Sequence, residues 1–242
     1  MVISDAVQER EKRIRPFIEK HAKTFGLDPN LVRAVITQES RFEAESTSPT
    51  GCFGYGQFSR IGAAQVQQIA QMHDVPNNEG LEDFTKPQAS DPDLGVKAIC
   101  ATLWWLLNKK YKHIIDEILK LEAALTFYNA GGNAAGIVVQ HGGHSKAVEA
   151  FKALPSNQRS QSVKYAPEVA SWFIQWHELM TEAPALVPVS EAPVARKGTG
   201  IEFKAFVEAL KLLGQMDPAV DVIVTSRDGF TEVSILLPGE FA

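Results

Sequence analysis

The pairs Asp28-Pro29 and Asp91-Pro92 each precede a run of apolar residues at helical spacing. Aspartate accepts hydrogen bonds from free amides at a helix N-cap, and proline has no amide hydrogen to leave unpaired at the first helical position. Both pairs therefore predict helix starts, and apolar spacing of the same kind recurs up to residue 182. We expect residues 1–182 to form a mainly α domain.

The spacing places further helices within residues 4–25, 59–73, 113–130, 145–154 and 167–182, and extends the one that starts at Asp91 to about residue 107. Residues 74–90 are polar and irregular, and we expect this long loop to line or cover a groove. Trp104 and Trp105 have leucine neighbours, so we expect them in the core rather than at a sugar-binding surface.

Glu39 occupies a position that the apolar face of its helix would give to a hydrophobic residue. Val32 and Ile36 lie on this face, and Glu39 follows Val32 by seven residues. Burial against an apolar wall raises the pKa of a glutamate from about 4.3 to about 6, so that it can donate a proton near neutral pH. The alternative is that the helix frays before Glu39 and leaves the carboxyl solvated.

A glycine-rich loop follows, from Ser48 to Gln57. Gly51, Gly54 and Gly56 permit positive φ angles and the close approach of a ligand or another backbone segment. No Lys-Ser or Lys-Thr pair follows these glycines, so the loop does not fit a phosphate-binding pattern.

Tyr128 ends the apolar face of the helix expected within residues 113–130. A phenol can hydrogen-bond a carboxyl group while its ring packs as a hydrophobe, so Tyr128 suits a partner for Glu39; the alternative is an ordinary core tyrosine. Cys52 and Cys100 are expected as free thiols, although a bridge would be possible if the glycine-rich loop lay against the helix of Cys100.

Four motifs, in this order, resemble those of lytic transglycosylases of the soluble-lytic-transglycosylase type. They are Glu39-Ser40, then Ser48 ahead of Gly51-x-x-Gly54-x-x-Gln57, then the run from Ala124 to Gly131 with Tyr128-Asn129 in it, and Tyr165 as a late tyrosine. The chain departs from the family at three places: Tyr55-Gly56 stand where Leu-Met is usual, Cys52 where alanine is common, and Gly95 where asparagine is frequent. The resemblance covers residues 27–180 and does not extend to the C-terminal segment.

The resemblance implies a lysozyme-like fold and cleavage of the β-1,4 bond between N-acetylmuramic acid and N-acetylglucosamine in peptidoglycan, with a 1,6-anhydro product. It implies that Glu39 is the general acid and base and that no cofactor is used. Roles in binding sugar or positioning Glu39 are implied for Ser48, Gln57, Tyr128, Asn129 and Tyr165. A metal site is not expected, because His141 and His144 have no acids or cysteines nearby in the sequence.

Two other functions remain open at the level of sequence. One is a hydrolase resembling goose-type lysozyme, in which a second carboxylate activates water. The candidates for that carboxylate are Glu43, Glu45, Asp74 and Asp91. The other is a structural component of a phage particle or secretion apparatus with weak or lost activity.

The net charge of −5 and the lack of a Lys/Arg cluster argue against nucleic acid as a partner. The longest nearly apolar run, residues 98–107, is about half the length that spans a bilayer. Residues 1–17 carry charges where a signal peptide needs its apolar stretch, so we expect no signal peptide and a protein that is virion-associated, or cytoplasmic with delivery to the periplasm or cell wall.

The composition changes after residue 182. Residues 183–199 contain three prolines and predict a linker. Residues 200–242 predict a small α+β module: a helix at 201–213, then strands at 220–225 and 231–237 around the turn Asp228-Gly229. Such a module is too small for confident stability alone, so we expect it to dock, to self-associate or to bind a virion or assembly partner.

Overall fold

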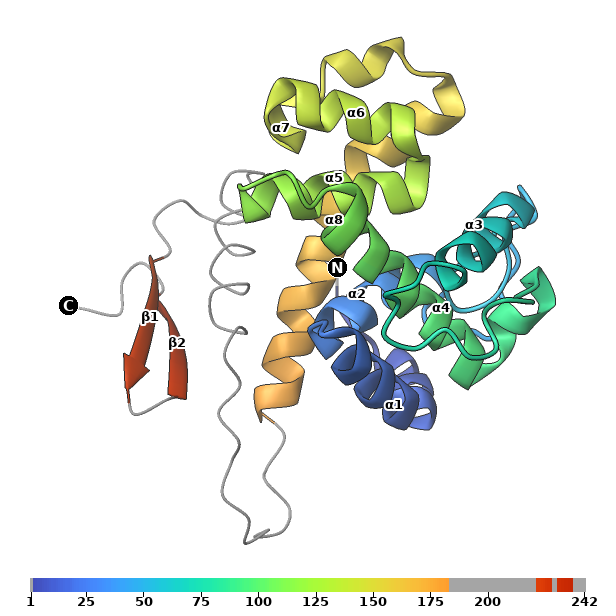
Figure 1. Ribbon diagram of the computed structural model, residues 1–242. Coiled ribbons are helices and arrows are strands. Elements are labelled where there is room, and N and C mark those ends of the chain that lie inside the picture. The colour runs from blue at the N-terminus through green and yellow to red at the C-terminus, as the bar shows by residue number, and fades with distance from the viewer. Residues whose placement is uncertain (1, 183–220, 228–229, 237–242) are drawn as a thin grey trace, which may run out of the picture.

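The computed structural model describes residues 2–182, 221–227 and 230–236. Residues 2–182 are mainly helical, which confirms the expected class (Figure 1). The helices, with η marking 3-10 and π turns, are α1 (Asp5–Phe25), α2 (Pro29–Ser40), α3 (Arg60–Ala70), η1 (Lys86–Ser90), α4 (Pro92–Trp105), η2 (Leu106–Lys110), α5 (Glu117–Ala130), α6 (Gly132–His141), α7 (His144–Ala147), η3 (Ala150–Ala153) and α8 (Ser156–Glu182).

The aspartates cap their helices as the sequence predicts. Asp28 Oδ1 accepts from the amide of Asn30 at 2.7 Å. Asp91 Oδ1 accepts from the amides of the second and third residues of α4, at 3.0 and 2.8 Å. Asp116 caps α5 in the same way, which is why α5 begins at Glu117 and not at residue 113.

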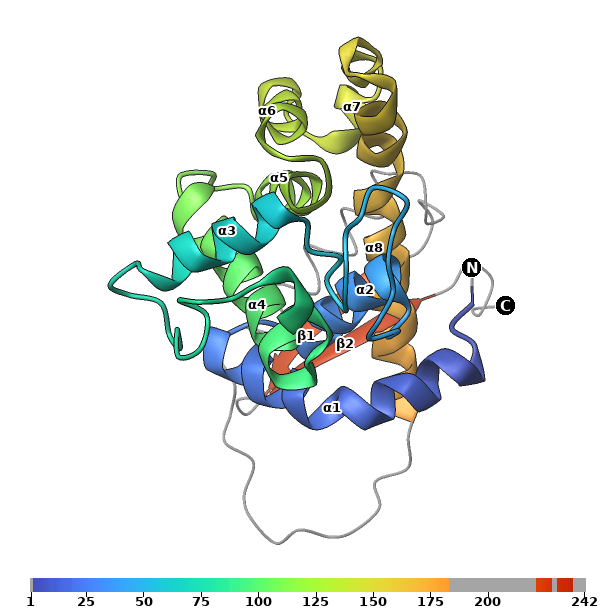
Figure 2. The ribbon, with the colours of Figure 1, turned by 90° about the vertical axis from the view of Figure 1, so that its right-hand side faces the viewer.

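Two groups of buried residues make up the core. The larger joins α1, α2, α3, α4 and α8, and the smaller joins η2, α5, α6, α7 and η3. Figure 2 shows the second group of helices above the first, with α8 running through both levels. Trp104 is 8% exposed and belongs to the larger core, while Trp105 packs against both groups, so their expected core placement is confirmed.

A buried ion cluster fixes α2 against α1. Arg33, only 1% exposed, donates from Nε to Glu11 Oε1 at 2.7 Å and from Nη1 to Asn30 Oδ1 at 3.1 Å. Its remaining nitrogen binds Glu19. A buried guanidinium with three such partners has its charge and its donors satisfied, so α2 is held in a single orientation.

The structure corrects the expected course of the chain in three places. Residues 132–141, which were not among the expected helices, form α6. Residues 144–154 form two short turns, α7 and η3, in place of one helix. The last helix begins at Ser156 and runs through Pro167. Pro167 removes only one backbone donor, and buried side chains on both sides of it, including Tyr165 and Val169, keep the helix packed.

The loop of residues 74–90 was expected to line or cover a groove, and that expectation is wrong for the cleft described below. This loop instead buries Leu81, Phe84 and Ala89 in the larger core, and none of its residues lines that cleft. Cys52 and Cys100 are both free thiols, as expected, and no bridge joins them.

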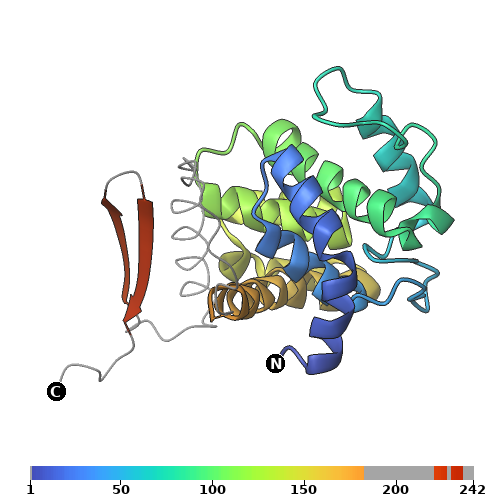
Figure 3. The ribbon, with the colours of Figure 1, turned by 90° about the horizontal axis from the view of Figure 1, so that it is seen from below.

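In the C-terminal segment the structure describes two strands, β1 (Asp221–Arg227) and β2 (Phe230–Leu236). They pair antiparallel with Val224 opposite Val233, as the predicted hairpin requires (Figure 3). The expected linker at 183–199, the helix at 201–213 and the turn at 228–229 lie outside the described residues. The division of the chain into domain, linker and docking module stays a prediction.

Candidate active site

A cleft of about 670 Å³ lies where α2, the glycine-rich loop, α5 and α8 meet. Its walls carry Glu39 together with Ser48, Gln57, Tyr128, Asn129 and Tyr165, so the structure brings all six sequence-predicted residues to one place. Their roles in binding and catalysis stay predictions. In the described residues no group of three or more His, Cys, Asp or Glu side chains could hold a metal ion.

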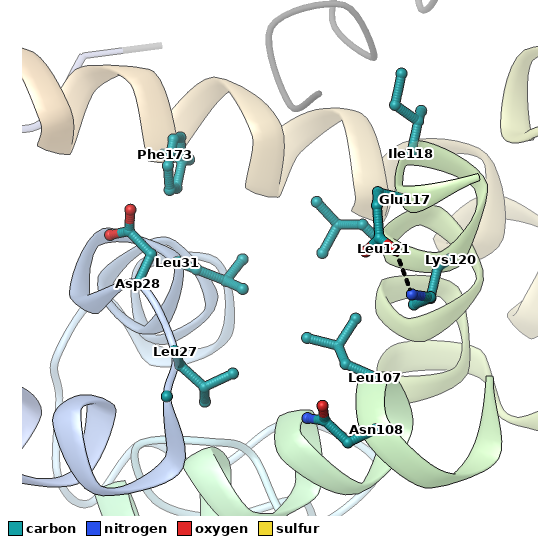
Figure 4. A pocket seen from close by; sticks show the side chains of 11 residues that line it. Leu27, Asp28, Leu31, Leu107, Asn108, Glu117, Ile118, Lys120, Leu121 and Phe173 are labelled. Carbon is teal, nitrogen blue, oxygen red and sulfur yellow. Dashed lines mark hydrogen bonds and ion pairs between the residues drawn. The ribbon is translucent and has the colours of Figure 1, made fainter. Parts of the chain in front are cut away.

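A second, smaller hollow of about 160 Å³ lies between the α1–α2 turn, α5 and α8 (Figure 4). Leucines and Phe173 dominate its wall, and Asp28 there already serves as the N-cap of α2. None of the six predicted residues lines this hollow. The chemistry that the sequence predicts therefore belongs to the larger cleft.

Glu39 lies in the last turn of α2, at the junction of the core and the cleft. Removal of its carboxyl from water disfavours the ionised form and raises its pKa from 4.5 to about 8, while a hydrogen bond from Tyr165 opposes this rise. The helix continues to Ser40, so it does not fray before Glu39, and the rise in the pKa is larger than the sequence indicated. At neutral pH Glu39 is mainly protonated and can donate a proton into the cleft.

Tyr165 is the hydrogen-bond partner of Glu39. Its phenol oxygen lies 2.5 Å from Glu39 Oε1, and the residue is only 4% exposed. Burial and the neighbouring carboxyl raise the pKa of Tyr165 well above its usual value, so the phenol keeps its proton and donates it to Glu39 in the hydrogen bond. A donor fixed in this way holds the carboxyl in one orientation.

The expectation that Tyr128 donates to Glu39 is wrong. The Tyr128 hydroxyl donates to the backbone carbonyl of Gly56 at 3.2 Å, and its ring meets Phe58 edge to face. Tyr128 therefore connects α5 to the glycine-rich loop. It still faces the cleft, where the nearby Glu39 contributes to raising the pKa of its phenol.

The glycine-rich loop is shaped by a close approach that only glycine permits. Gly54 has φ +79°, and a Cβ there would lie 2.3 Å from the carbonyl oxygen of Ala89. The amide of Tyr55 donates to that same oxygen at 3.0 Å, and Ser40 Oγ donates to the carbonyl of Tyr55 at 2.9 Å. The loop is thereby attached both to η1 and to the residue that follows Glu39.

Gln57 and Ser48 make internal hydrogen bonds of the loop. Gln57 has φ +48°, and its Nε2 donates to the carbonyls of Ser46 at 2.9 Å and Gly54 at 3.0 Å. Ser48 Oγ accepts from the amide of Cys52 at 3.0 Å. These contacts set the shape of one cleft wall, and among the described residues neither side chain is hydrogen-bonded to Glu39.

Asn129 is different, because its amide nitrogen is buried and has no acceptor among the described residues. A buried amide without a partner costs free energy unless something else accepts its hydrogen bond. Asn129 also lines the cleft, so this unpartnered amide lies beside the space that a ligand would occupy.

Sequence reasoning missed several cleft residues, among them Gln38, Lys164 and Glu168. Glu168 provides a second carboxylate, one helical turn after Tyr165 on α8. The sequence contained a signal for Glu168. It falls in the helix predicted at 167–182 and follows Tyr165, one of the predicted site residues, by three positions. None of the four carboxylates considered as a second catalytic acid (Glu43, Glu45, Asp74, Asp91) lines the cleft.

The structure thus shows a helical domain with an open cleft, in which the Glu39 carboxyl has a raised pKa and is hydrogen-bonded by the phenol of Tyr165. The family model described as "Transglycosylase SLT domain" matches residues 16–150, which is more than half of the chain. The chain belongs to this family.

Two relatives and one solved structure are similar to this chain. The membrane-bound lytic murein transglycosylase C of Haemophilus influenzae is 27% identical over 142 residues, covering 55% of this chain and 35% of that protein. The membrane-bound lytic murein transglycosylase F of Desulfosudis oleivorans is 40% identical over 60 residues, covering 25% of this chain and 13% of that protein. The X-ray structure of an inactive mutant of lytic transglycosylase Slt from Pseudomonas aeruginosa has a TM-score of 0.49 and 19% identity, covering 70% of this chain and 25% of that one. The chain spans about a third of the first relative's length and less of the others.

Proposed function

We propose that this chain is a peptidoglycan lytic transglycosylase, with Glu39 as its general acid and base. The observation that carries the proposal is a carboxyl that lines the cleft, accepts a hydrogen bond from the phenol of Tyr165 at 2.5 Å and has a pKa raised to about 8. Family membership supports peptidoglycan as the substrate class.

In the first step, protonated Glu39 donates its proton to the oxygen of the β-1,4 bond between N-acetylmuramic acid and N-acetylglucosamine. The bond from that oxygen to the anomeric carbon of the muramic acid then breaks, and the N-acetylglucosamine side leaves as an alcohol. Glu39 becomes a carboxylate, and the phenol of Tyr165 stabilises its charge through the 2.5 Å hydrogen bond.

In the second step, the 6-hydroxyl of the muramic acid attacks its own anomeric carbon, and the Glu39 carboxylate takes the hydroxyl proton. A 1,6-anhydro ring forms and Glu39 returns to its acid form, so no water is consumed. One carboxyl suffices because the substrate supplies the nucleophile.

We assign substrate contacts to other residues of the cleft. The unpartnered amide of Asn129 would donate to a carbonyl or hydroxyl oxygen of the sugar chain. Ser48 and Gln57 hold the loop wall against which the chain would lie, and Tyr128 holds that wall to α5.

The test is digestion of purified peptidoglycan with the Glu39→Gln variant, followed by mass analysis of the products. We expect anhydro-muropeptides from the wild type and a loss of at least about 100-fold in the variant, because the amide has no proton to transfer. Glu45→Gln is the matched control, since Glu45 is exposed and lies off the cleft. Release of the same products by Glu39→Gln within a few-fold of the wild type would refute the proposal.

A hydrolase is the second candidate, and the observation that favours it is Glu168 on the same cleft. A water activated by Glu168 would give reducing ends, which are heavier than anhydro ends by one water. Glu168→Gln should then abolish cleavage, whereas a transglycosylase should retain its product type in this variant. The product mass decides between the two reactions.

No described helix is both long and apolar enough to cross a membrane.

We propose that residues 200–242 bind a virion or assembly partner that brings the protein to the cell wall. The support for this proposal is the sequence alone. We expect the protein to co-purify with structural proteins of the virion or assembly, and we expect this co-purification to be lost when residues 200–242 are removed.

A further inference from the structure

Three consecutive residues at the end of α2 each form a side-chain hydrogen bond with α8. Trp176 Nε1 donates to Thr37 Oγ1 at 2.7 Å, and Trp172 Nε1 donates to Gln38 Oε1 at 2.9 Å. Tyr165 donates to Glu39 at 2.5 Å. The partners run backward along α8 as the chain runs forward along α2, so these bonds fix how α8 is placed against the catalytic end of α2.

Gln38 is the central residue of these three, because both the oxygen and the nitrogen of its amide form hydrogen bonds with α8. Its Oε1 accepts from Trp172, and its Nε2 donates to Glu168 Oε2 at 2.7 Å. An indole nitrogen can only donate, and Glu168 Oε2 accepts, so these two partners determine which way the amide points. Gln38 thereby clasps two positions of α8 that are one helical turn apart.

Tyr165 lies one turn before Glu168 on α8. A clasp on residues 168 and 172 limits rotation and sliding of the helix at this level, and therefore limits where the phenol of Tyr165 can lie. Gln38 precedes Glu39 in the chain, but among the described residues no hydrogen bond joins their two side chains.

We propose that Gln38 is a positioning residue, which holds α8 so that the Tyr165 hydroxyl meets the Glu39 carboxyl. The proposal rests on the catalytic role proposed for Glu39, but its geometry can be tested without turnover. If the clasp is lost, the phenol moves away from the carboxyl and the ionised form of Glu39 loses its donor.

The titratable groups that share the cleft with Glu39 come from three elements. They are Tyr165, Glu168 and Lys164 on α8, Tyr128 on α5, and Cys52 in the glycine-rich loop. Of these, Tyr165 is the one with a hydrogen bond to Glu39. A change in the titration of Glu39 after removal of the clasp is therefore expected to pass through Tyr165, and a double-mutant design can show whether it does.

The experiment follows the carboxyl of Glu39 by ¹³C NMR titration of the full chain with labelled glutamate, its signal identified by its absence in Glu39→Gln. Gln38→Met keeps the length of the side chain and removes both hydrogen bonds. We expect it to raise the pKa of Glu39 by about 0.5 to 1, because the ionised carboxylate then loses part of its hydrogen bond from Tyr165.

Thr37→Val is the matched control, because it removes a bond between the same two helices two side chains away from Glu39. It should lower the melting temperature and leave the pKa of Glu39 unchanged. In a Tyr165→Phe background, Gln38→Met should add no further rise, because the donor that it positions is already gone.

The proposal is overturned if Gln38→Met leaves the pKa of Glu39 where it is, if Thr37→Val raises it equally, or if the two changes at Gln38 and Tyr165 add. Trp172→Phe, which removes only the indole donor, replaces Gln38→Met if that variant does not fold. Because the titration needs no turnover, a wild type without anhydro products would refute the proposed function and leave this test intact.

Discussion

Replacement of Tyr165 by phenylalanine removes one hydroxyl and should move the pH dependence of cleavage upward. The Tyr165 hydroxyl donates to the Glu39 carboxyl and opposes the rise in pKa that burial causes. A hydrogen bond to a charged group contributes about 1.5–3 kcal/mol, and one pKa unit corresponds to about 1.4 kcal/mol, so the full loss would raise the pKa by about 1 to 2.

The lower value is the better expectation, because the cleft is open and water can replace the phenol in part. The wild-type pKa of about 8 should therefore become about 9 in the variant. Since the acid form of Glu39 starts the reaction, activity is present below this pKa and is lost as the pH rises through it.

The assay is the initial rate of anhydro-muropeptide release at low substrate concentration, measured by mass spectrometry from about pH 5 to about pH 10. The midpoint of the alkaline limb gives the pKa of Glu39 in the free enzyme. A midpoint that stays in place or moves downward in Tyr165→Phe would show that the phenol does not stabilise the ionised carboxyl, and the account of the site would fail.

Three further predictions concern Glu39, the glycine-rich loop and the C-terminal segment. Glu39→Gln should stabilise the fold increasingly as the pH rises from 4.5 to about 8, because over this range the folded wild type keeps the Glu39 carboxyl protonated while the unfolded chain gives up that proton. At pH 7 the gain in unfolding free energy has an upper value of about 3 kcal/mol, and it should vanish below about pH 4.5 in thermal melts of the two proteins. Gly54→Ala should destabilise by at least about 2 kcal/mol, because the new Cβ meets Ala89, whereas the control Gly51→Ala, with φ +81° and no atom within 4 Å, should cost only about 1 kcal/mol in urea unfolding. Truncation after Glu182 should leave a helical domain that still cleaves isolated peptidoglycan, and a folded but inert fragment would show that the C-terminal segment contributes to the site.

The sequence alone determined most helices and the place of Glu39 on its helix. Caps at Asp28 and Asp91 and apolar spacing are local features, in which residues a few positions apart decide the backbone hydrogen bonds. The position of Glu39 on the apolar face follows from the same local rule. The sequence missed the helix at residues 132–141, because its glycines are unfavourable in isolation and packing outweighs them.

Only the tertiary structure decided which tyrosine donates a hydrogen bond to Glu39. Tyr128 and Tyr165 both suit the role by chemistry, and the choice depends on how α5 and α8 pack against α2, across 126 residues of sequence in the case of Tyr165. The hydrogen bonds of Gln38 with Trp172 and Glu168 could not be predicted from the sequence for the same reason. Local spacing fixes which side of a helix a residue occupies, whereas the partner across the interface is set by the rotation and sliding of two helices, which no short-range pattern encodes.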